Sequence, residues 1–152
     1  MSNPHTSRTP SRLTIAAIAL EVFLAIGALG GGLALMLGPR GETLPLPVAL
    51  LSGAPFDSYF VPGLTLFGLL GVGPLVVAVL AWRGQRWAPL LTTGVGGTLL
   101  TWLVVQIAMV GYSNEPPFQP IYLALGAVIS AVGIASLRRA GLASRTGHPA
   151  TG

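Results

Sequence analysis

The sequence predicts an all-α integral membrane protein, a four-helix bundle with both termini in the cytoplasm. Three observations support this prediction: four long apolar runs, a composition that is 52% hydrophobic and 8% charged, and an uneven distribution of arginine. A soluble domain carries about 25% charged residues, so a chain this poor in charge is typical of a membrane protein. The lipid bilayer is therefore the first expected partner.

The apolar runs set the boundaries of the expected spans. Each has about 20 or more residues, enough to cross a hydrocarbon layer of roughly 30 Å at about 1.5 Å per helical residue. Together they form a transmembrane domain over residues 12-138, with tails at 1-11 and 139-152 whose polar composition predicts disorder. The expected spans cover residues 13-37, 60-82, 87-112 and 118-137.

The first span contains Glu21, the one acid within any of the four runs. Its run is longer than the apolar core of a signal peptide, about 7–15 residues, and we expect it to be retained. Counting equal depth along the other spans places Glu21 level with Pro74, with the stretch Thr93–Thr98 and with Ser130. Because an ionised carboxylate is costly at that depth, we expect a mostly protonated Glu21 that donates a hydrogen bond to one of them. The sequence leaves two alternative roles for Glu21: a structural hydrogen bond between helices, or the handling of protons or cations.

The other spans contribute a kink, an amide and a hydroxyl. Pro74 removes a backbone donor in the middle of the second span and predicts a kink there. Gln106 lies about two-thirds of the way across the third span, where an amide bonds a neighbouring helix or lines a pocket. Ser130 offers a hydroxyl in the fourth span. Glycines recur in every span, which predicts close helix packing within the monomer or, alternatively, a seam between copies.

Arginine placement predicts the orientation of the chain. Seven of the eight arginines precede the first span, follow the fourth span or lie between the second and third spans, and Arg40 alone falls on the other side. Cytoplasmic segments carry this excess of positive charge, which predicts a multi-pass protein of the inner (plasma) membrane with both termini cytoplasmic.

Aromatic and acidic residues gather at the expected outer boundary. The candidate outer-face pocket consists of Asp57, Tyr59, Trp102, Tyr112 and Tyr122. Interfacial aromatic side chains are typical of the headgroup level, and together with Gln106 they could also hold a lipid or another small molecule. For Asp57 the alternative interpretation is a helix cap at the start of the second span.

Catalytic and metal sites find no support in the sequence. There is no Cys, and both His residues, His5 and His148, lie in the tails, so neither a Ser–His–acid set nor a metal-ligand cluster is expected. No nucleotide-binding motif is present either. We therefore expect no enzyme activity, no cofactor, no metal and no nucleic-acid partner.

Several short motifs between Gly31 and Gly126 resemble a family of small uncharacterised bacterial membrane proteins. They are Gly31-Gly32-Leu33-Ala34-Leu35, Pro39-x-Gly41, Leu51-Ser52-x-x-Pro55-Phe56-x-x-Tyr59-x-x-Pro62-Gly63, Arg86-Trp87, Trp102 with Val105-Gln106, and Gln119-Pro120 with Tyr122. The resemblance implies four spans and a bacterial inner membrane. It implies no mechanism, since the function of the family is unassigned, and Glu21 lies outside the shared motifs.

Three classes of function follow as hypotheses. The first is an accessory or structural membrane subunit that docks onto another membrane protein through its glycine-rich faces. The second is an oligomeric small-solute or proton-coupled transporter, in which copies of the chain assemble around Glu21. The third is an outward-facing lipid-binding protein that uses the aromatic cluster.

Overall fold

The computed structural model describes residues 10–43, 57–112 and 117–146, and within these ranges the chain is helical with no β-strand. Four helices are long and apolar enough to cross a membrane: Arg12–Leu37, Phe60–Trp82, Ala88–Ala108 and Phe118–Gly141. The predicted all-α class is therefore confirmed, as are four helices long and apolar enough to span a membrane. The apolar middle of the first connector and most of the two tails lie outside the described residues.

The first helix, α1 (Arg12–Leu37), has a well-defined start and end. Ser11 caps its N-terminus, where the Ser11 side chain accepts a hydrogen bond from the backbone N–H of Thr14 at 3.1 Å. At the other end the backbone N–H of Gly38 donates to the carbonyl of Ala34. Gly38 is buried against Thr43 in the turn that follows, so no larger residue fits there without displacing that turn.

The second span consists of three consecutive helical segments, α2 (Phe60–Thr65), the π-helical segment η2 (Leu66–Val72) and α3 (Gly73–Trp82). The sequence predicts a kink at Pro74, and the π-helical segment lies directly before that residue. In η2 the backbone N–H of Gly73 reaches the carbonyl of Gly68, five residues back. A widened turn relieves the clash between a proline ring and the carbonyl four residues before it.

The third and fourth spans are α4 (Ala88–Val110) and α5 (Phe118–Thr146). The amide of Gln119 donates to the carbonyl of Gly111 at 3.1 Å and so joins the start of α5 to the end of α4. The sequence predicts an end of the fourth span at residue 137 and a disordered tail from 139, whereas α5 continues to Thr146. Arginine, alanine and leucine, which favour a helix, make up most of residues 138 to 146, and Pro149 comes only later; the single Gly141 is tolerated within α5.

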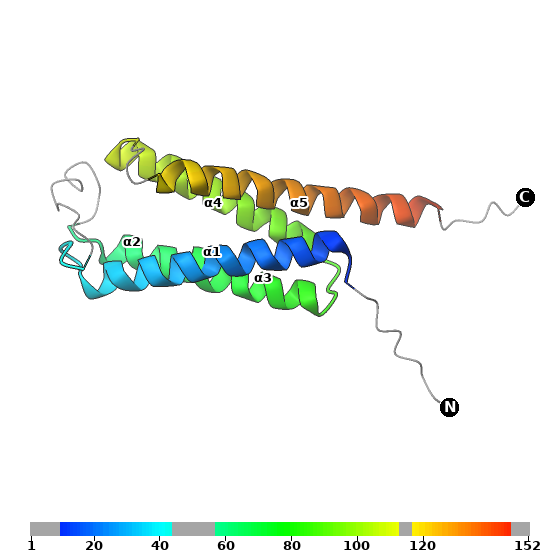
Figure 1. Ribbon diagram of the computed structural model, residues 1–152, viewed down its shortest axis with the longest axis horizontal. Coiled ribbons are helices and arrows are strands. Elements are labelled where there is room, and N and C mark those ends of the chain that lie inside the picture. The colour runs from blue at the N-terminus through cyan, green and yellow to red at the C-terminus, as the bar shows by residue number, and fades with distance from the viewer. Residues whose placement is uncertain (1–9, 44–56, 113–116, 147–152) are drawn as a thin grey trace, which may run out of the picture.

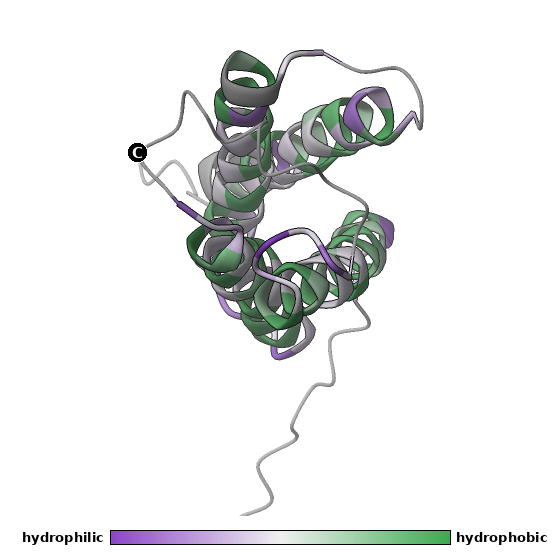
Figure 2. Ribbon diagram, turned by 90° about the vertical axis from the view of Figure 1, so that its left-hand side faces the viewer, coloured by the Kyte–Doolittle hydropathy of each residue, from purple (hydrophilic) through white to green (hydrophobic). Residues whose placement is uncertain are grey.

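The helices form two antiparallel pairs. In Figure 1 the pair of α4 and α5 lies above α1 and the second span, and α4 descends toward α1 and α3 at its N-terminal end. Figure 2, which looks along the helices, shows the same two layers with apolar residues around each helix. The hydrophobic core between the layers is formed by Leu24, Ala28, Leu70, Val77, Val95, Leu99, Leu103, Leu125 and Ile129.

Glycines allow close contacts within each pair. A Cβ atom at Gly32 would lie 2.7 Å from the carbonyl oxygen of Gly63, so α1 and α2 approach backbone to backbone. Gly96 of α4 approaches Gly126 and Ser130 of α5 in the same way, with 2.7 Å between its Cβ position and the Gly126 carbonyl oxygen. Small residues permit such approach in lipid, where apolar burial alone gives little driving force.

Candidate functional site

Glu21 forms a buried hydrogen bond between the two helix pairs. Its side chain exposes 0% of its surface, and its Oε1 accepts from the hydroxyl of Thr92 at 2.7 Å. Thr92 is itself buried. Each of these residues lies about one turn from a core residue of its own helix, Glu21 before Leu24 and Thr92 before Val95. The bond therefore links α1 to α4 at the edge of the hydrophobic core.

The second carboxyl oxygen of Glu21 is buried without a hydrogen-bond partner among the described residues. The sequence predicts that Glu21 donates to Pro74, to Thr93–Thr98 or to Ser130. The partner is instead Thr92, one residue before that stretch, and Thr92 is the donor. Counting residues gives the depth of a side chain in the membrane but not the rotation of the neighbouring helix. The rotation of α5 places Ser130 against Gly96.

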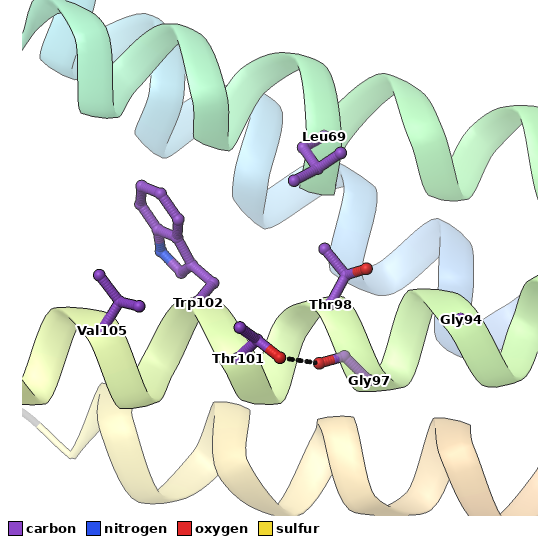
Figure 3. Close-up of a pocket in the computed structure, with 7 residues that line it drawn as sticks. All are labelled: Leu69, Gly94, Gly97, Thr98, Thr101, Trp102 and Val105. Atoms are coloured by element: carbon purple, nitrogen blue, oxygen red, sulfur yellow. Dashed lines mark hydrogen bonds between the residues drawn. The ribbon is translucent and has the colours of Figure 1, made fainter.

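An open groove runs between the second span and α4. Its volume is about 480 Å³, and it is lined by Leu69, Gly94, Gly97, Thr98, Thr101, Trp102 and Val105. Figure 3 shows Thr98 and Trp102 pointing from α4 toward Leu69 on η2. Six of its seven lining residues belong to α4, so this helix presents one face of small and hydroxyl side chains to the groove.

The glycines of this groove differ from those within the helix pairs. A Cβ atom at Gly94 or Gly97 would meet nothing within 4 Å, and the same is true of Gly68, which lies beside Leu69 on η2. Two small-xxx-small pairs result, Gly94 with Thr98 and Gly97 with Thr101. The spacing that the chain uses for its internal helix contacts therefore recurs here on a face without a neighbour.

Two polar groups on α4, one in the groove and one beyond its lining, have no hydrogen-bond partner among the described residues. The hydroxyl of Thr98 and the exposed amide of Gln106 form no hydrogen bond within the described ranges, whereas the hydroxyl of Thr101 donates to the carbonyl of Gly97 at 2.9 Å. Gln106 follows the buried Leu99 by two turns and lies on the same side of α4. Its exposure shows that α4 diverges from the second span toward its C-terminal end, as Figure 1 also shows.

The five residues of the predicted outer-face pocket have different surroundings. Trp102 lines the groove. Tyr59 is 6% exposed, its backbone N–H donates to the carbonyl of Pro39 at 2.8 Å, and burial raises the pKa of its phenol. The hydroxyl of Tyr122 contacts the backbone at Gly27, so this side chain packs between α5 and α1. Asp57 and Tyr112 are both exposed.

Sequence reasoning missed Thr92 and Thr101, and it named Thr98 only as part of the stretch at the depth of Glu21 and not as part of a groove. For Thr92 the available signal is its depth, which is within one residue of the stretch named for Glu21. For the groove the signal is the interleaved spacing Gly94-x-x-x-Thr98 and Gly97-x-x-x-Thr101. That spacing identifies a face for helix contact, but only the fold shows that the face is left open.

Comparison with known proteins adds no relative from which a function could be transferred. No protein-family model, curated protein or solved structure matches this chain. The resemblance noted in the sequence motifs therefore stays an expectation, and the functional argument rests on the two sites described above.

Proposed function

We propose that this protein is an accessory subunit of the inner (plasma) membrane that binds a transmembrane helix of another membrane protein along the groove of α4. In this proposal the four spans form a bundle with both termini in the cytoplasm. The observation that carries the proposal is the face of Gly94, Gly97, Thr98 and Thr101, which is open, whereas the glycine contacts within each helix pair, such as Gly32 with Gly63 and Gly96 with Gly126, are occupied.

The chemistry of the groove favours a helix as its occupant. Gly94 and Gly97 leave room for a backbone to approach, as Gly32 and Gly63 do within the first pair. The hydroxyl of Thr98 in the groove, and the exposed amide of Gln106 beyond it along α4, supply hydrogen bonds that lipid tails cannot accept or donate. Such a bond between helices contributes about 0.6–1.7 kcal/mol, and the partner helix is expected to carry a polar side chain at this level.

Two glycine substitutions test the docking. Gly97→Leu fills the groove at a position with no atom nearby, so the monomer is expected to fold while the partner is lost. Gly30→Leu is the matched control, because a Cβ atom at Gly30 of α1 also meets nothing within 4 Å and Gly30 lies outside the groove. Native mass spectrometry of gently extracted, chromosomally tagged protein should show a heteromeric complex with Gly30→Leu and wild type, but not with Gly97→Leu.

The same experiment distinguishes the alternatives. A homo-oligomer without foreign chains would contradict the accessory role and favour an assembly of identical copies. A lipid retained in the wild type and lost in Gly97→Leu, without any partner chain, would favour lipid binding instead. Equal partner binding by both leucine variants would exclude the groove as the docking site.

Proton handling by Glu21 is the second candidate function, and it is favoured by the buried Oε2 atom, which has no hydrogen-bond partner in the described part of the chain. An intramembrane carboxyl group is a functional candidate by default, because burying it costs free energy. Glu21 is, however, separate from the groove and fully buried. Glu21→Gln keeps the acceptor for Thr92 and removes the titratable group, so unchanged folding with loss of a cellular phenotype would support this role.

A further inference from the structure

One end of the molecule gathers arginine side chains and lacks nearby acids. Arg12 begins α1, Arg83 follows α3, Arg86 precedes α4, and Arg138 and Arg139 lie on α5 where it passes beyond the expected span. All five are exposed. Among the described residues none of them forms an ion pair, and Glu21, the acid nearest to Arg12 in sequence, is buried about two and a half turns inside α1. We call these five residues the arginine end.

The antiparallel register of α4 and α5 brings two of these arginines to the same level. A Cβ atom at Gly133 would meet both the backbone of Thr93 and the carbonyl of Pro89, so Gly133 lies opposite the midpoint of that segment. Arg86 lies five residues before that midpoint, in the turn that leads into α4, and Arg138 lies five residues after Gly133 on α5. At about 1.5 Å per helical residue Arg138 lies about 7.5 Å beyond Gly133, and the turn brings Arg86 to a similar level at the same end of the molecule.

The height of this pair matches the lipid phosphates. Arg138 follows Phe118 by 20 residues on one continuous helix, which corresponds to about 30 Å, the thickness of the hydrocarbon layer. Arg86 stacks over the ring of Trp87 with 5.1 Å between its guanidinium carbon and the ring centroid, which holds the cation at the interfacial level.

We propose that the arginine end binds the phosphate of an anionic phospholipid, with Arg86 and Arg138 on either side of the headgroup. Two like charges at one height repel unless an anion lies between them, and guanidinium groups bind phosphate through paired hydrogen bonds. The site lies at the opposite end from Arg40 and is independent of the groove. Its occupant is thus a lipid from the surrounding membrane and not the partner helix.

Lipid titration with matched variants tests this site. Purified protein in a neutral detergent is titrated with phosphatidylglycerol or with phosphatidylcholine of the same acyl chains, and bound lipids are counted by native mass spectrometry. Wild type should prefer phosphatidylglycerol, and the double variant Arg86→Gln/Arg138→Gln should bind it about ten- to thirtyfold more weakly. Arg40→Gln removes one arginine charge at the other end of the molecule. This variant should bind phosphatidylglycerol as wild type does.

A lysine variant and a phosphate control complete the design. Arg86→Lys/Arg138→Lys keeps both charges without the paired donors, so its affinity should lie between those of wild type and the glutamine variant. Circular dichroism with unchanged helix content shows that the variants are folded. Equal loss in Arg40→Gln, or no preference between the two lipids, would overturn the proposal. Displacement of the lipid by equimolar inorganic phosphate would do the same, because the site would then be one for free anions.

Discussion

Gly96 and Gly97 are neighbours in α4 with opposite surroundings, and they make a sharp test at the level of single residues. A Cβ atom at Gly96 would lie 2.6 Å from the backbone nitrogen of Ser130, whereas one at Gly97 would meet nothing within 4 Å. Gly96→Ala should therefore destabilise the protein by about 1–3 kcal/mol. Gly97→Ala should be neutral or stabilise it by up to about 1 kcal/mol, since alanine favours the helix. Unfolding by sodium dodecyl sulfate in mixed micelles measures both, and equal effects would contradict the packing of α4 on α5.

The hydrogen bond between Thr92 and Glu21 gives the second prediction for single residues. Thr92→Val keeps the size of the side chain but leaves both carboxyl oxygens of the buried Glu21 without a partner among the described residues. We expect a loss of about 0.6–1.7 kcal/mol in the same unfolding assay. Thr101→Val is the control, because its hydroxyl bonds a carbonyl of its own helix on an exposed face. A loss as large in the control would mean that the bond between helices contributes nothing specific.

At the level of helices, the sequence predicts well that each helix exists and how deep its residues lie in the membrane. It predicts less well where a helix ends and which side it turns toward its neighbours. The expected spans at 13-37 and 60-82 agree with α1 and with the composite second span to within one residue. The π-helical segment was not foreseen, because a change of hydrogen bonding from four to five residues leaves the apolar pattern intact. Thr92 was missed for a related reason: the rotation of α4 depends on packing against α5, which the pattern of one helix does not contain.

The length of α5 is the prediction that belongs to this level. The helix continues to Thr146, about two turns beyond the expected end of the membrane span. Because the chain has no Cys, nitroxide labels can be attached to single introduced cysteines at positions 138 to 146. Label mobility and accessibility should vary with a period of about 3.6 residues. Uniformly fast spectra across these positions would show a disordered tail and would contradict the helical extension.

The whole molecule consists of two antiparallel helix pairs that are joined at the Glu21 side and diverge toward Gln106. The buried bond from Glu21 to Thr92 lies nearer the arginine end, and the exposed amide of Gln106 lies toward the other end of α4. The groove occupies the region between these two positions, where α4 is still close to Leu69. This geometry explains how one chain can have a firm core and an open face: α1 and α5 stay packed as far as Tyr122, whereas α4 leaves the second span toward Gln106.

The orientation of this asymmetric molecule is a prediction that intact cells can test. The arginine excess favours a cytoplasmic location for the connector with Arg83 and Arg86. The two proposals depend on this orientation, because the orientation decides which leaflet supplies the lipid and toward which side of the membrane the groove opens. Gln85→Cys and Asp57→Cys place single thiols in the two opposite connectors, at exposed positions in a cysteine-free chain. A membrane-impermeant maleimide should label Asp57→Cys in intact cells and label Gln85→Cys only after permeabilisation. The reverse pattern would place both termini outside and the arginine end in the outer leaflet, whereas equal labelling in intact cells would indicate a mixed orientation.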